Sequence, residues 1–171
     1  MKGIRKLCDE EGILMICDEV QCGMGRTGAM FAWQAYDIKP DIMSMAKAIG
    51  SGIPVGAFAM TEEVAKYSLE PGDHGTTYGG NPLACTAVSK TIEIFEKKHL
   101  VEHVQKVGAY LTKKLEELVE EYDTVKAVKG KGLMQGIQVT KPISEITGAA
   151  LKEGLLIIGA GSDVIRFVPP L

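Results

Sequence analysis

Residues 13–56 read ILMICDEVQCGMGRTGAMFAWQAYDIKPDIMSMAKAIGSGIPVG. Two short apolar runs in this stretch, Ile13–Cys17 and Ile42–Ala46, each lead directly to a charged residue, Asp18 and Lys47. Short apolar runs of this kind are typical of strands buried on both faces of a parallel sheet. Ligands of open α/β proteins bind at the carboxyl ends of such strands, so we expect Asp18 and Lys47 at that edge. The stretch therefore predicts an α/β fold with its site at this edge.

Lys47 has mostly apolar neighbours in the sequence. A lone lysine is more often a solvated surface group, because its charge resists burial. The neighbours of this one are almost all apolar, namely Met43, Met45, Ala46, Ala48 and Ile49. A lysine amine in apolar surroundings can attack a carbonyl carbon and form a Schiff base. Pyridoxal phosphate (PLP) needs such a lysine and also a carboxylate beside its ring nitrogen, for which Asp18 is the candidate.

Three segments resemble the class III (ornithine-type) aminotransferases. They are DEVQCGMGRTG from Asp18, AYDIKPDIMSMAKAIGSGIPVGA from Ala35, and HGTTYGGNPLA from His74. The resemblance covers nearly the whole chain, keeps the motifs in order, and is greatest for the enzymes that act on acetylornithine. It implies that Lys47 is the Schiff-base lysine and Asp18 the pyridinium partner. It also implies that Gln21 hydrogen-bonds the phenolic oxygen of PLP and that Val20 packs on one face of the ring.

Thr76 and Thr77 precede a strong helix start, in which Asn81 is placed to cap the helix and Pro82 to open it. Free amides and the helix dipole at such a terminus favour an anion such as phosphate. A glycine-rich turn of this kind can equally be a flexible loop without a ligand. The resemblance implies that Thr77 contacts the PLP phosphate of the partner subunit in a homodimer, with Thr76 near the substrate.

Arg166 stands in the apolar segment VIRFVPPL. A buried arginine needs a partner, so the residue forms either a structural salt bridge or a bidentate clamp on a carboxylate. The planar guanidinium suits the second role. In the family, the arginine of this motif holds the α-carboxylate of the substrate.

Two further motifs have simpler interpretations. Residues 23–28, GMGRTG, match the dinucleotide-binding pattern GxGxxG, but DEVQC intervenes after the strand and Pro40 leaves room for only a short helix. A bent loop beside the cofactor fits better. His99, Glu102 and His103 match HxxEH, a zinc pattern, but solvated helix histidines are the simpler interpretation. We therefore predict no metal site.

Composition excludes several classes of function. The chain has 171 residues, 46% of them hydrophobic, and a net charge of −3 with no basic block, so nothing indicates nucleic acid or an anionic membrane. No apolar run approaches the length of a bilayer span, and the start lacks a signal-peptide core. The cysteines form no CxxC pair, which suits reduced thiols. We expect a cytoplasmic protein.

The sequence pattern predicts helices and strands along the whole chain. Helices are expected at 1–11, 31–36, 82–98, 99–122 and 144–153, and strands at 13–17, 42–45, 55–60, 125–128, 133–139, 155–158 and 164–168. We place a domain boundary near residue 95. The resemblance implies that residues 1–95 form the C-terminal part of a fold-type I PLP-transferase large domain, with a mostly parallel sheet. Residues 96–171 would form the α+β small domain.

The resemblance also implies the reaction. The expected activity is transfer of an ω-amino group from N-acetylornithine to 2-oxoglutarate in arginine biosynthesis, with ornithine, succinyldiaminopimelate or 4-aminobutyrate as alternative donors. The family's chains are longer, and the phosphate-binding glycine-rich loop, the ring-stacking aromatic residue and the closing helix would lie outside these residues. Two hypotheses follow, namely the lysine-bearing part of an aminotransferase and a non-catalytic domain or assembly partner.

Overall fold

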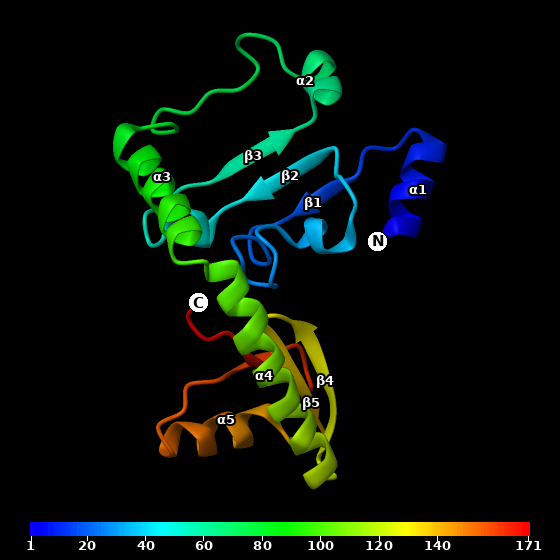
Figure 1. Ribbon diagram of the computed structural model, residues 1–171, viewed down its shortest axis with the longest axis vertical. Coiled ribbons are helices and arrows are strands. Elements are labelled where there is room, and N and C mark those ends of the chain that lie inside the picture. The colour runs from blue at the N-terminus through cyan, green and yellow to red at the C-terminus, as the bar shows by residue number, and fades with distance from the viewer. The chain divides into compact units, whose positions relative to one another are not determined.

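The structure, a computed structural model, describes all 171 residues. The chain folds into two compact units. Unit 1 consists of Met1–Gly25 and Ala29–Leu100, and unit 2 of Arg26–Gly28 and Val101–Leu171 (Figure 1). Three residues of the glycine-rich loop are thus part of unit 2 although both flanking segments belong to unit 1.

Unit 1 is built on a three-stranded sheet with the strand order β1-β2-β3. Strands β1 and β2 are parallel, and β3 runs antiparallel to β2 (Figure 1). The expected parallel pairing therefore holds for one of the two strand pairs. The elements are α1 (Lys2–Glu11), β1 (Ile16–Asp18), the 3₁₀ helix η1 (Ala32–Tyr36), β2 (Ile42–Met45), the 3₁₀ helix η2 (Lys47–Gly50), β3 (Ala57–Met60), α2 (Glu62–Ser68) and α3 (Pro82–Lys97).

Helix ends in unit 1 follow local capping chemistry. Gly12 ends α1 in the left-handed region, with φ at 65°. Asn81 caps α3 by accepting a hydrogen bond from the Ala84 amide at 3.0 Å, which confirms the predicted helix start. Helix α2 was not predicted, although Thr61 caps it and two glutamates fill its first turn. The sequence thus contains the local signal for this helix.

The prediction that residues 13–17 form a strand buried on both faces is wrong. Strand β1 begins only at Ile16, whose exposed fraction is 63%, and Met15 is the buried residue of this stretch. The reason is the position of β1 at the edge of the sheet, where β2 is its single neighbour. An apolar run alone does not distinguish a central strand from an edge strand.

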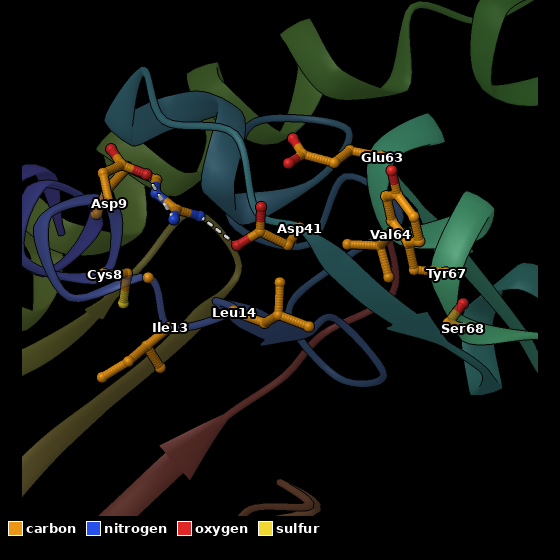
Figure 2. A pocket seen from close by; sticks show the side chains of 11 residues that line it. Cys8, Asp9, Ile13, Leu14, Asp41, Glu63, Val64, Tyr67 and Ser68 are labelled. Carbon is orange, nitrogen blue, oxygen red and sulfur yellow. Dashed lines mark hydrogen bonds and ion pairs between the residues drawn. The ribbon is translucent and has the colours of Figure 1, made fainter.

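A network of charges joins α1 to the start of the sheet. Arg5 forms ion pairs of 2.7 Å with both Asp9 and Asp41, and Figure 2 shows both pairs in the pocket that they line. Asp41 also accepts a hydrogen bond from the Met15 amide at 2.6 Å. Burial raises the pKa of the Asp41 carboxyl, but the bonds from Met15 and Arg5 lower it by more, so the pKa lies below its usual value. The network therefore stabilises the folded state of unit 1.

Unit 2 contains an antiparallel sheet with the strand order β4-β5-β7-β6. Its core consists of Leu115, Ile137, Val139 and Ile165, with partly buried side chains of α4 and α5 packed against it. The elements are α4 (Leu100–Glu121), β4 (Val125–Lys131), β5 (Met134–Val139), α5 (Ile143–Lys152), β6 (Ile158–Ala160) and β7 (Val164–Phe167). None of the helices in the chain combines the length and the apolar character that crossing a bilayer requires.

The sequence placed most elements of unit 2 correctly. Helix α4, which has an apolar stripe every three or four residues, agrees with the prediction within a residue at each end. The strand expected at residues 155–158 is wrong, because β6 begins at Ile158 and the preceding Leu155 and Leu156 are exposed. Apolar character there does not indicate a paired strand.

Candidate active site

Asp18 and Lys47 lie at the same edge of the sheet in unit 1. Asp18 is the last residue of β1 and stands opposite Ser44 of β2 in the strand register. Lys47 opens η2, two residues after β2 ends. Because β1 and β2 are parallel, their carboxyl ends share one edge of the sheet. The structure therefore brings the two predicted residues to a common edge.

The carboxylate of Asp18 is held by local hydrogen bonds. Its Oδ1 accepts one from the Val20 amide at 2.9 Å and one from the Ser44 hydroxyl at 3.3 Å. Both bonds engage the same oxygen, which leaves Oδ2 without a hydrogen bond from the chain. The residue is exposed at the sheet edge. Asp18 thus offers a fixed carboxylate with one free oxygen.

Lys47 is exposed, so the expectation of a lysine enclosed by apolar residues is wrong for these 171 residues. The reason is its position at the start of a turn, where the apolar neighbours Ile49 and Gly50 are buried and the lysine is not. Its φ of 51° lies in the left-handed region, which non-glycine residues rarely adopt. Such backbone outliers cluster at functional sites. The turn holds the amine at the open edge of the sheet.

Glu19 is a residue that the sequence did not single out. It has an exposed fraction of 4%, and its carboxylate accepts hydrogen bonds from the amides of Ala32 at 2.9 Å and Trp33 at 3.0 Å. Burial, together with the neighbouring Glu19 carboxylate, raises the pKa of the Cys22 thiol to about 11. The Glu19 carboxylate therefore ties the start of η1 to the carboxyl end of β1. The single sequence signal for this role is the acidic side chain of Glu19 itself, directly after Asp18.

The remaining cofactor candidates lie in two places in unit 1. Val20 is half-buried and Gln21 is exposed, both directly after Asp18 and Glu19. Thr76 and Thr77 are exposed in the loop before α3, where the Thr76 hydroxyl accepts a hydrogen bond from the Gly79 amide at 3.3 Å. No hydrogen bond links these threonines to Asp18 or Lys47. The first pair therefore adjoins the sheet edge that carries Asp18 and Lys47, and the second pair belongs to a separate loop.

Arg166 is placed on β7 of unit 2, opposite Gly136 of β5. The side chain forms no ion pair within the chain, so the structural salt bridge that the sequence left open is not formed. Its Nε atom is buried and has no hydrogen-bond partner. A buried donor without a partner costs free energy, which an incoming carboxylate would recover.

Comparison of the sequence with known protein families identifies the family of this chain. The sequence profile of the Aminotransferase class-III family matches residues 1–171. The chain belongs to the class III aminotransferase family. It is thus homologous to PLP-dependent enzymes. The resemblance that three segments carried is therefore confirmed over the whole chain.

Individual relatives of this class III chain carry specific enzyme names. Acetylornithine aminotransferase of Methanocaldococcus jannaschii is 47% identical over all of this chain, which covers 43% of that protein. Ornithine δ-aminotransferase of Plasmodium falciparum has a TM-score of 0.92 and 32% identity, with 99% of this chain and 45% of that chain covered. Taurine:2-oxoglutarate aminotransferase of Bifidobacterium kashiwanohense, solved with PLP and glutamate, has a TM-score of 0.91 and 31% identity, with 99% and 43% covered. The chain spans less than half the length of each of these proteins.

Proposed function

We propose that this chain is the lysine-bearing part of a PLP-dependent aminotransferase that transfers the ω-amino group of N-acetylornithine to 2-oxoglutarate in arginine biosynthesis. The observation that carries the proposal is the placement of Asp18 and Lys47 at the carboxyl ends of two adjacent parallel strands. The identity of 47% to an acetylornithine aminotransferase supports the choice of donor. In the same proposal, unit 1 belongs to the PLP-binding large domain and unit 2 to the small domain of a cytoplasmic homodimer.

The residues at this edge fit the chemistry of PLP. Asp18 has a carboxylate oxygen free of internal hydrogen bonds, which can accept a bond from the ring N–H and keep the ring nitrogen protonated. The Lys47 amine is exposed and can hold the aldehyde carbon of the cofactor. PLP, when bound, supplies an electron sink for the electron pair left on the substrate carbon. When it is not joined to the aldehyde, the Lys47 amine would accept the proton that leaves this substrate carbon.

Other residues of the chain complete the proposed site. Gln21 donates a hydrogen bond to the phenolic oxygen of the cofactor, and Val20 packs on one face of its ring. Thr77 contacts the phosphate bound by the partner subunit, and Thr76 lies near the substrate. Arg166 binds the carboxylate that the amino donor and 2-oxoglutarate have in common, which its unpartnered Nε supports.

The decisive experiment locates the lysine that holds PLP. The enzyme carrying this chain is loaded with PLP, reduced with borohydride and mapped by peptide mass spectrometry. The pyridoxyl group should lie on Lys47, and the Lys47→Arg variant should carry none. Lys66, which is also exposed in unit 1, is the internal control and should remain unlabelled. Labelling spread over several lysines would refute the assignment.

A second candidate is that these 171 residues alone act as a non-catalytic domain or assembly partner. The exposure of Lys47 favours it. An absorbance spectrum after addition of PLP separates the two, because a lysine-linked cofactor absorbs differently from free PLP. Initial rates with N-acetylornithine, ornithine, succinyldiaminopimelate and 4-aminobutyrate then identify the donor.

A further inference from the structure

Arg26, in the glycine-rich loop, has its contacts in unit 2. Its Nη1 donates hydrogen bonds to the carbonyl oxygens of Leu133 at 3.1 Å and Pro169 at 2.5 Å. Its own carbonyl oxygen accepts a hydrogen bond from the Leu133 amide at 2.9 Å. Burial lowers the pKa of the Arg26 guanidinium, so placing this charge here carries a desolvation cost. These bonds connect the loop to the β5–β7 pair.

The two carbonyl groups that Arg26 binds lie where the β5–β7 ladder stops. The last paired residues are Gln135 and Phe167, and extending that register by two positions would bring Leu133 opposite Pro169. Pro169 has no N–H, so it cannot donate to the Leu133 carbonyl across the pair. The guanidinium of Arg26 supplies the missing donor and bridges both strands. A side chain thus replaces one step of the ladder.

The surrounding backbone leaves the loop little freedom. A Cβ atom on Gly132 would come within 2.5 Å of the Thr27 backbone, and one on Gly108 within 2.7 Å of the Gly132 carbonyl oxygen. Gln105 of α4 also donates to the Gly28 carbonyl at 2.7 Å. Helix α4, the β4–β5 turn and the loop are therefore in direct backbone contact. Each of these contacts restrains the loop, so the loop cannot carry the Arg26 guanidinium away without breaking them.

We propose that Arg26 is a positioning residue for Arg166: by closing the open end of the β5–β7 pair, it sets where the Arg166 guanidinium can meet a substrate carboxylate. Arg166 lies in β7 just before the carbonyl that Arg26 holds, and it pairs with Gly136 at the same end of β5. The inference rests on the proposed role of Arg166 and goes beyond it, because the observed bonds of the Arg26 side chain go to backbone carbonyl groups and its proposed action is through Arg166.

Steady-state kinetics of the PLP-loaded enzyme carrying this chain test the inference. Arg26→Gln should raise KM for N-acetylornithine and for 2-oxoglutarate together by about tenfold, with kcat within about threefold, as expected for loss of a charged hydrogen bond. Arg26→Lys keeps the charge, but its shorter side chain holds the ammonium farther from the two carbonyl oxygens, so it should raise both KM values by about threefold. Lys129→Gln, which removes an exposed charge from β4, is the matched control and should leave both within about twofold.

A double-mutant cycle distinguishes action through Arg166 from a general loss of stability. If Arg26 acts through Arg166, Arg26→Gln should add less than about twofold to KM in an Arg166→Lys background. A lower melting temperature with unchanged KM values, or fully additive effects, would overturn the inference. Unchanged KM in Arg166→Lys alone would instead refute the proposed role of Arg166. If Arg26→Gln does not fold, Arg26→Lys carries the same cycle.

Discussion

The edge of unit 1 that carries Asp18 and Lys47 contrasts with the corner of unit 2 around Arg26 and Gly132. At the edge, side chains are exposed and are held by short local turns. In the corner, backbone segments touch where glycine leaves no space for a side chain. Groups at the edge can therefore change with little cost in folding free energy. In the corner, the contacts that stabilise the fold are also those that position Arg166.

The largest effect is expected for Asp18→Asn at the edge. Asparagine retains the oxygen that accepts hydrogen bonds from Val20 and Ser44, but removes the charge that would keep the PLP ring nitrogen protonated. We expect transamination to slow on the order of a thousandfold or more, or about 4 kcal/mol in barrier height. Single-turnover rates with N-acetylornithine measure this.

The stability of Asp18→Asn should differ from the parent by less than about 0.5 kcal/mol, because the residue is exposed. Asp123→Asn, at the exposed turn before β4, is the matched control and should change neither rate nor stability. A rate within tenfold of the parent in Asp18→Asn would mean that the carboxylate is merely structural.

The next largest effect is expected for Gly132→Ala in the corner. Gly132 has φ at 59° and no room for a Cβ, whereas Gly161 in the same unit has φ at 69° with open space around it. Gly161→Ala should therefore cost about 1 kcal/mol for backbone strain alone. Gly132→Ala should cost a further 1 to 3 kcal/mol, because the loop must move away from its Cβ.

Hydrogen exchange resolved by peptide can separate these two costs. In Gly132→Ala, faster exchange should include residues 26–28 as well as β5, whereas in Gly161→Ala it should be confined to the β6–β7 turn. Equal costs in the two variants would mean that the loop yields freely and that the corner is no more rigid than the β6–β7 turn.

The two regions also differ in how well the sequence predicted them. Asp18 and Lys47 could be singled out as candidates because each follows an apolar run and carries a group with recognisable chemistry. The exposure of Ile16 could not be predicted, since a run of apolar residues does not say how many strands flank it. The bond from Arg26 to Pro169 could not be predicted either, because it joins residues 143 positions apart in the sequence. Local chemical features can be predicted from the sequence, whereas long-range backbone contacts cannot.

The smallest effect on stability is expected for two ion pairs that join α1 to the residues before β2, namely Arg5–Asp41 and Lys2–Asp37. The Asp41 side chain has an exposed fraction of 23% and pairs with Arg5, whereas that of Asp37 has one of 92% and pairs with Lys2. A hydrogen-bonded, partly buried carboxylate contributes about 1 to 3 kcal/mol, whereas solvent screens an ion pair as exposed as that of Asp37. Asp41→Asn should therefore destabilise unit 1 by more than Asp37→Asn does.

The pH dependence of that difference follows from the lowered pKa of Asp41. The folded state holds this carboxylate ionised more firmly than the unfolded chain, so its contribution is fully present above the unfolded value of about 4 and is lost as the pH falls through the lower folded value. The gap in unfolding free energy between the parent and Asp41→Asn should thus be constant near pH 7 and shrink below about pH 4. Urea unfolding followed by fluorescence of Trp33, the single tryptophan and a residue of unit 1, measures it. A gap that does not change between pH 7 and pH 3 would show that Asp41 stabilises unit 1 through its shape and not through its charge.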